Sequence, residues 1–186
     1  MRIIAGEKRS RRLKAPEGMD TRPTGDKVKE ALFSMLLSRL PGARVLDLYS
    51  GSGALSLEAL SRGADSAVMV DISPKACRII DENIQSLDYQ DRARLLRMGD
   101  MAAIALLKKQ GDAFDLIFLD PPYRINAAPV CEKLAQEGLL KPEGLMVVEH
   151  AKETPPDVGA PLVLRDRRQY GIAGLSFYEW MGEDEA

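Results

Sequence analysis

The stretch ARVLDLYSGSGALSLEAL, residues 43–60, decides the fold of this chain. Its first seven residues are mostly apolar, as in a strand buried on both faces, and residues 54–63 have the pattern of a helix that ends at a glycine. Between them, Gly51 and Gly53 can adopt positive φ angles and let the backbone approach a ligand closely. A strand that passes through a glycine loop into a helix is typical of an α/β sheet that binds ligands at the carboxyl ends of its strands.

The rest of the chain repeats this alternation of strands and helices. Runs rich in Val, Leu and Ile predict strands at residues 43–49, 66–72, 93–98, 114–120 and 144–150. Amphipathic or capped segments predict helices at residues 25–40, 54–63, 73–88 and 127–138. Two further runs, 162–168 and 174–181, flank a glycine-bearing turn and predict an antiparallel hairpin at one edge. We therefore expect an α/β fold with a mostly parallel sheet and helices on both faces.

Composition and charge narrow the class of protein. The chain has 186 residues, 45% of them hydrophobic, and a formal net charge of -2, which fits one compact domain. Positive charge gathers in KRSRRLK, residues 8–14, so we expect a basic N-terminal arm over residues 1–22 and one domain over residues 23–186. No apolar run reaches the roughly 20 residues of a membrane span or the length of a secretory signal. A soluble cytoplasmic protein without membrane contact is expected.

The cysteine and histidine content argues against a metal centre. Cys77 and Cys131 stand far apart, and His150 is the only histidine, so neither a disulfide framework nor a zinc site is expected. Both cysteines are predicted to be small apolar packing residues.

Acidic residues accompany three successive strand ends. Asp47 lies near the end of the first strand, Asp71 ends the second and Asp100 follows the third. Asp47 would repel a diphosphate but attract a cationic ligand with an amino group, such as S-adenosylmethionine. Asp71 would then accept hydrogen bonds from the ribose hydroxyls, and Asp100 would meet the adenine amine. Each acid alone would equally suit a solvated strand end; the three beside a glycine loop favour a cofactor site. The candidate cofactor-binding residues are Asp47, Tyr49, Ser50, Gly51, Gly53, Asp71, Ile72, Asp100 and Met101.

The stretch FDLIFLDPPY, residues 114–123, begins as a buried strand and ends in Asp120, Pro121, Pro122 and Tyr123. Proline has no N–H, so this loop presents a carboxylate and carbonyl oxygens as hydrogen-bond acceptors. Acceptors from Asp120 and Pro121 would hold an exocyclic amine in line with a methyl donor, and Tyr123 would stack on the base. A rigid turn after a strand is the simpler alternative.

These segments resemble a known family. VLDLYSGSGALSLEALSRGA, Asp71 and FLDPPY resemble the amino-methyltransferases of the Rossmann-like seven-stranded S-adenosylmethionine-dependent fold. MRIIAGEKRSRRL, TRPTGDKVKEALFSML and RQYGIAGLSFYEW resemble the bacterial small-subunit ribosomal RNA guanine-N2 methyltransferase family, and the resemblance covers nearly the whole chain. It implies methyl transfer from S-adenosylmethionine to the N2 amine of one guanine in 16S ribosomal RNA, within an assembled or assembling small subunit. We expect the enzyme to be a monomer.

RNA contacts are expected outside the pocket, because a guanine must leave its helix to reach the acceptor loop. Basic residues of the arm would contact phosphates, and residues of the C-terminal hairpin would flank the pocket. The candidates are Arg9, Arg11, Arg12, Lys14, Arg22, Arg167, Arg168 and Tyr170. A solvated basic stretch is the alternative.

Other functions fit the sequence less well. A DNA amino-methyltransferase would share the acceptor loop, but the chain has no room for a target-recognition domain. A non-catalytic RNA-binding or assembly factor would be expected to show a damaged donor or acceptor loop, and neither is damaged. A nicotinamide-dependent oxidoreductase is disfavoured by Asp47, Ser56 and DPPY together.

Overall fold

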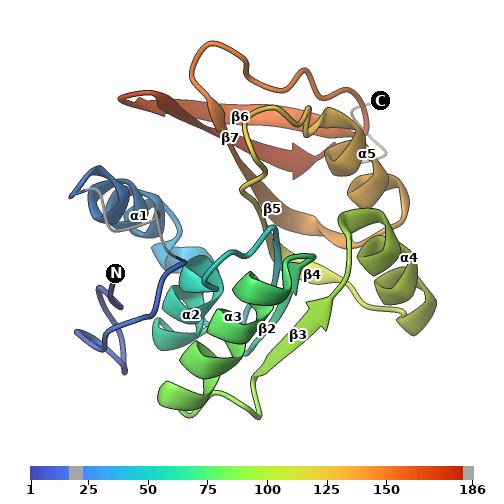
Figure 1. Ribbon diagram of the computed structural model, residues 1–186. Coiled ribbons are helices and arrows are strands. Elements are labelled where there is room, and N and C mark those ends of the chain that lie inside the picture. The colour runs from blue at the N-terminus through green and yellow to red at the C-terminus, as the bar shows by residue number, and fades with distance from the viewer. Residues whose placement is uncertain (17–22, 182–186) are drawn as a thin grey trace.

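In the computed structural model, which describes residues 1–16 and 23–181, the described chain forms a seven-stranded sheet (Figure 1). The strand order is β3-β2-β1-β4-β5-β7-β6. The strands are β1 (Arg44–Leu48), β2 (Ser66–Asp71), β3 (Ala93–Arg97), β4 (Phe114–Leu119), β5 (Leu140–Ala151), β6 (Leu162–Tyr170) and β7 (Ala173–Trp180). The first five strands are parallel, and β7 runs antiparallel to both β5 and β6. The predicted fold class and the C-terminal hairpin are confirmed.

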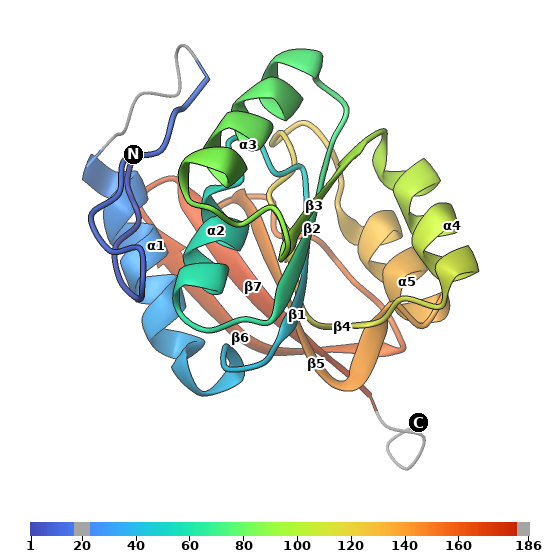
Figure 2. The ribbon, with the colours of Figure 1, turned by 90° about the horizontal axis from the view of Figure 1, so that it is seen from below.

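Helices cover both faces of this sheet, as Figure 2 shows. They are α1 (Pro23–Met35), a short 3-10 helix η1 (Leu37–Arg39), α2 (Ala54–Ser61), α3 (Pro74–Ser86), α4 (Asp100–Gln110) and α5 (Ala128–Gln136). Helices α1, α2 and α3 lie on one face, and α4 and α5 lie on the other. Each face has its own apolar core, which explains why the central strands are apolar at almost every position.

Two helix predictions need correction. The helix expected over residues 25–40 begins earlier, at Pro23, and its α-helical part ends at Met35, followed by the single 3-10 turn of η1. Leu36 and Leu40, on either side of this 3-10 turn, keep right-handed helical backbone angles, so the chain tightens into the 3-10 form before Pro41 rather than leaving helical geometry at Met35. Helix α4 was not predicted; it runs from Asp100 to Gln110 and is capped by Gly111, which has a left-handed φ of 73°.

The strand order reverses at β1, which lies between β2 and β4. Leu48 of β1 is in register with Leu119 of β4, so the glycine loop after β1 and the DPPY loop after β4 leave the sheet at the same edge. Such a switch point opens a crevice at the carboxyl ends of the strands, where α/β proteins bind their ligands.

The described part of the N-terminal arm is packed against the domain rather than extended from it. An antiparallel bridge between Arg2 and Arg12 folds the arm back on itself, and Ile3 and Leu13 are buried in the core formed with α1, α2 and α3. Glu58, fully buried in α2, accepts hydrogen bonds from the backbone N–H groups of Ile4 and Ala5 at 2.8 and 3.0 Å. The boundary predicted between arm and domain falls outside the described residues.

The cysteines and the lengths of the helices also bear on the sequence predictions. Cys77 and Cys131 are both buried and unbonded to each other, in keeping with their predicted packing role. Within residues 1–16 and 23–181, no helix has the length and apolar character needed to cross a membrane.

Candidate active site

The loop after β1 is built on left-handed backbone. Tyr49, Gly51 and Gly53 have φ angles of 64°, 59° and 77°. At Gly53 an added Cβ would lie 2.9 Å from the sulfur of Met69, so the close approach of loop and sheet requires glycine there. The N–H of Gly51 donates to Oδ2 of Asp71 at 2.9 Å. Asp71 therefore fixes the loop that the sequence assigned to cofactor binding.

Asp47 lies beneath this loop, with only 1% of its surface exposed. The hydroxyl of Ser56, in α2, donates to Oδ2 of Asp47 at 3.0 Å. Burial raises the pKa of Asp47 to about 7, the hydrogen bond from Ser56 opposes that rise, and the nearby charge of Asp71 adds to it. Ser56 was not predicted as a site residue. Its position in the sequence could have identified it, because Ser56 stands where a dinucleotide fingerprint has a third small residue.

Asp71 and Asp100 keep free acceptor capacity at the same edge. Oδ1 of Asp71 accepts from the N–H of Ser73, the residue that caps α3. Asp100 is the first residue of α4, and its two oxygens accept from the N–H of Met101 and the hydroxyl of Tyr49. Each carboxylate oxygen has more than one lone pair, so both acids can accept further hydrogen bonds from a ligand.

Large apolar side chains stand exposed beside these acids. Ile72, Met101 and Tyr123 are 75%, 49% and 44% exposed, and they follow the carboxyl ends of β2, β3 and β4. Residues of this kind are usually buried, so their gathering at one edge indicates a binding surface for a flat, partly apolar group.

Asp120 and Glu149 form a pair of acids where β4 and β5 end. Leu119 and Val148 are in register, so the next residues, Asp120 and Glu149, are neighbours on adjacent strands. Asp120 is exposed at the surface. Even so, partial loss of hydration among the surrounding protein atoms raises its pKa well above the usual range, and the negative charges of Glu149 and Asp47 raise it further. The Asp120 carboxylate is thus close enough to Glu149 and Asp47 for their negative charges to disfavour its ionisation. Burial also raises the pKa of Glu149, whose Oε1 accepts from the Tyr123 hydroxyl at 3.3 Å.

A pocket of about 380 Å³ is lined by Glu149 and by Pro121, the residue that follows Asp120. The DPPY loop forms one wall through Pro121 and Tyr123, and the end of β5 and the loop after it form the other through Glu149 and Pro156. Its size suits a base or a small nucleotide segment. Glu149 was not predicted as a site residue.

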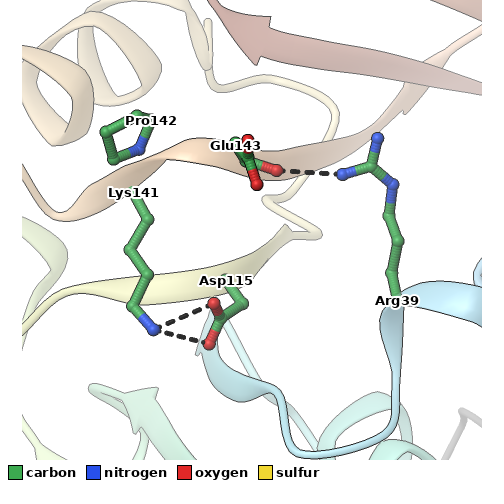
Figure 3. Close-up of a pocket in the computed structure, with 5 residues that line it drawn as sticks. All are labelled: Arg39, Asp115, Lys141, Pro142 and Glu143. Atoms are coloured by element: carbon green, nitrogen blue, oxygen red, sulfur yellow. Dashed lines mark hydrogen bonds and ion pairs between the residues drawn. The ribbon is translucent and has the colours of Figure 1, made fainter.

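A larger hollow, of about 500 Å³, lies at the opposite edge of the sheet (Figure 3). Lys141 donates to both oxygens of Asp115 at 2.9 Å, and Arg39 donates to the backbone oxygen of Glu143 at 3.0 Å. Asp115 stands near the start of β4 and Asp120 follows its end, a separation of about 16 Å along the strand. Because Lys141 and Asp115 bond to each other and Arg39 is bonded to the backbone, we assign this hollow a structural role.

His150 is a structural residue of strand β5. Its Nδ1 lies 2.8 Å from the backbone oxygen of Ala151, which only accepts, so Nδ1 carries the proton. Nε2 then accepts from the Ser176 hydroxyl at 2.8 Å. Burial lowers the pKa of His150, which keeps the ring neutral. Within the described residues, no group of three or more His, Cys, Asp or Glu side chains is arranged to hold a metal ion.

Some of the predicted RNA-binding residues are exposed without an ion pair, and others already bond to neighbouring residues of the chain. Arg9 and Arg12 are exposed and make no ion pair within the described part of the chain. Arg11 donates to the backbone oxygen of Ser86, and Lys14 pairs with Glu82 at 2.8 Å. Arg22 lies outside the described residues. On the hairpin, Arg167 donates to Ser176, Arg168 pairs with Asp166, and Tyr170 is partly buried against the core.

One buried side chain, Asn83 of α3, forms hydrogen bonds with both the arm and the glycine loop. Its Nδ2 donates to the backbone oxygens of Lys14 and Ser52, both at 2.9 Å. Its Oδ1 accepts from the N–H of Lys14 at 2.8 Å. The predicted RNA-binding arm is therefore held next to the predicted cofactor loop.

A mostly parallel seven-stranded sheet with a final antiparallel hairpin, and with a glycine loop after its first strand, is the Rossmann-like methyltransferase fold. The model of the family described as Conserved hypothetical protein 95 matches residues 1–179, and the chain belongs to that family.

Individual relatives match over almost their whole length. The chain is 38% identical over 184 residues to "Putative rRNA methyltransferase YlbH" of Bacillus subtilis, covering 98% of this chain and 100% of the relative. It is 33% identical over 190 residues to "Ribosomal RNA small subunit methyltransferase D" of Escherichia coli strain K12, covering 100% of this chain and 94% of the relative. A solved structure described as "Putative methyltransferase yhhF from Escherichia coli" superposes with a TM-score of 0.83 at 32% identity, covering 97% of both chains.

Proposed function

We propose that this protein transfers a methyl group from S-adenosylmethionine to the exocyclic N2 amine of one guanine in 16S ribosomal RNA, within the small ribosomal subunit. The observation that carries the proposal is the placement of Asp120 and Pro121 at the end of β4, beside the glycine loop that follows β1. The names of the relatives supply the substrate class, the RNA of the small subunit. We take the enzyme to be a cytoplasmic monomer.

The glycine loop fits S-adenosylmethionine better than a dinucleotide. Asp47 puts negative charge beneath the loop, where it would repel a diphosphate and attract a sulfonium or ammonium group. Asp71 has acceptor capacity for the ribose hydroxyls, and exposed Ile72 and Met101 offer apolar contact to an adenine ring. When bound, S-adenosylmethionine supplies a methyl group activated by its positively charged sulfur.

The DPPY loop supplies the contacts that an amine nucleophile needs. Neither proline has an N–H, so the loop offers the Asp120 carboxylate and the Pro121 carbonyl as acceptors. Two hydrogen bonds from the amine would orient its lone pair toward the methyl group. The amine gains a positive charge as it gains the methyl group, and Asp120 stabilises that charge. The raised pKa of Asp120 also suits it to accept the proton that the product amine then loses.

The arm supports an RNA substrate. Exposed Arg9 and Arg12 can reach phosphates, and Asn83 ties this arm to the glycine loop. A guanine that leaves its helix could enter the pocket beside Tyr123, whose exposed ring can stack on the base.

The test is an identification of the methylated nucleoside. The full-length protein is incubated with methyl-labelled S-adenosylmethionine and small subunits from cells that lack the activity, with naked ribosomal RNA and DNA in parallel. We expect label in N2-methylguanosine from the subunits. Label in DNA would favour a DNA amino-methyltransferase, and measurable cofactor binding without label in any substrate would favour a non-catalytic assembly factor.

A further inference from the structure

Glu149 occupies a position at the acceptor site that the mechanism above does not use. It follows Val148, which is in register with Leu119, and it therefore stands beside Asp120 on the neighbouring strand. Adjacent strands are about 4.8 Å apart, and residues at matching positions point to the same face. Both carboxylates consequently face the same side of the sheet, and Glu149 lines the pocket that Pro121 and Tyr123 also line.

Two neighbouring acids are an unfavourable arrangement in a protein without a ligand. Like charges directly opposite on adjacent strands repel each other. Within the described residues, Glu149 makes no ion pair that would offset this repulsion, and its hydrogen-bond partner is the neutral hydroxyl of Tyr123. An acid pair of this kind suits a ligand that donates hydrogen bonds to both carboxylates at once.

Guanine presents such donors side by side. On its Watson–Crick edge the ring N1–H lies next to the N2 amine, so both groups donate. Adenine and cytosine instead present a bare ring nitrogen beside their amine, and its lone pair would face a carboxylate that only accepts.

We propose that Glu149 selects guanine by accepting its N1–H, while Asp120 and the Pro121 carbonyl hold the N2 amine; the inference rests on the proposed function. The hydroxyl of Tyr123, from the facing wall of the pocket, donates a hydrogen bond to the Glu149 carboxylate and holds it at the pocket. A bare ring nitrogen in place of N1–H would leave Glu149 without its donor and would place two lone pairs against each other. Polar sites of this kind reject ligands that lack the matching group.

The test compares two acceptor bases that share the N2 amine. Small subunits are reconstituted with ribosomal RNA that carries either guanine or 2,6-diaminopurine at the methylated position. 2,6-Diaminopurine keeps the N2 amine but has a bare N1. We expect the wild-type enzyme to prefer guanine by about tenfold to a hundredfold in kcat/KM, the discrimination that one well-formed polar contact provides. Glu149→Gln should lose or reverse this preference, because the glutamine amide can donate to a bare N1.

A matched control separates base selection from a general change of charge. Glu153→Gln removes the same charge four residues further on, at an exposed position that does not line the pocket, and it should retain the wild-type preference. Binding of S-adenosylmethionine to Glu149→Gln should stay within about twofold of wild type if the fold is intact.

The outcomes distinguish this inference from the proposed function. If wild-type enzyme methylates guanine and Glu149→Gln keeps the full preference for guanine over 2,6-diaminopurine, Glu149 does not select the base. If the wild-type enzyme places no methyl group on guanine N2 in these subunits, the proposed function itself fails.

Discussion

The hydroxyl of Ser56 donates a hydrogen bond to the buried carboxylate of Asp47, and this bond joins the first turn of α2 to the end of β1. A dinucleotide-binding loop has a third glycine or alanine at this position, which leaves space for close packing. Here that position holds Ser56, whose hydroxyl donates to the Asp47 carboxylate. The contact helps a buried acid to ionise at neutral pH, where its negative charge can attract a cationic cofactor.

The pKa of Asp47, about 7, predicts that cofactor affinity depends on pH. The ionised carboxylate attracts the cationic cofactor, and below pH 7 the acid is mostly protonated in the free protein. Affinity for S-adenosylmethionine should therefore weaken as the pH falls from 7.5 to 5.5, approaching about tenfold per pH unit below the pKa. Titration calorimetry across this range measures the effect.

Two variants check that Asp47 is responsible. Ser56→Ala removes a hydrogen bond that lowers the pKa of Asp47, so the midpoint of the pH dependence should move to higher pH. Asp47→Asn should bind weakly with a much flatter profile. A wild-type affinity that is constant over the whole range would refute a role for the Asp47 charge.

Asp120→Ala should separate transfer from cofactor binding. Asp120 holds the amine and stabilises its developing charge, so its loss should reduce kcat by at least about a hundredfold. Asp47, Asp71 and Asp100 are untouched, and cofactor affinity should remain close to wild type. Single-turnover transfer and calorimetry measure the two quantities. Asp91→Ala, which removes an exposed acid before β3, is the control, and near wild-type turnover by Asp120→Ala would contradict the assigned role.

The strands and the glycine loop could be predicted because their signals are local. Buried parallel strands are apolar at almost every position, and strand-end acids such as Asp71 can be read from the same runs. Glu149 could not be recognised in the same way, since its role depends on the pairing of β5 with β4, across nearly thirty residues. Likewise, KRSRRLK resembles an unattached tail in sequence, because Glu82 and Asp88, which neutralise Lys14 and Lys8, lie about seventy or more residues further along the chain.

The docked position of the arm predicts a specific sensitivity at Gly6. Its φ is 85°, and an added Cβ would lie 1.8 Å from the backbone oxygen of Ser61. Gly6→Ala should therefore displace the arm, destabilise the protein by about 3 kcal/mol or more, and weaken binding to small subunits. Faster tryptic cleavage within residues 8–14 would report the displacement directly.

Gly42 provides a matched control for this variant. Its φ is 74°, but nothing lies within 4 Å of an added Cβ. Gly42→Ala should cost only about 1 to 2 kcal/mol from the left-handed backbone and should leave subunit binding unchanged. Equal effects of both substitutions on binding would show that the docking of the arm has no part in substrate recognition.

The exposed arginines of the arm should account for part of the salt dependence of RNA binding. Arg9 and Arg12 carry no ion pair within the described chain, whereas Lys8 and Lys14 each pair with an acid. If Arg9 and Arg12 each contact one phosphate, replacing both with alanine should reduce the slope of log affinity against log salt by about 1.4 to 1.8. Filter binding to small subunits at several salt concentrations measures the slope. Lys109→Ala, an exposed position on α4 across the sheet from the arm, should leave it unchanged. A double variant with the wild-type slope would show that these arginines do not contact RNA phosphates.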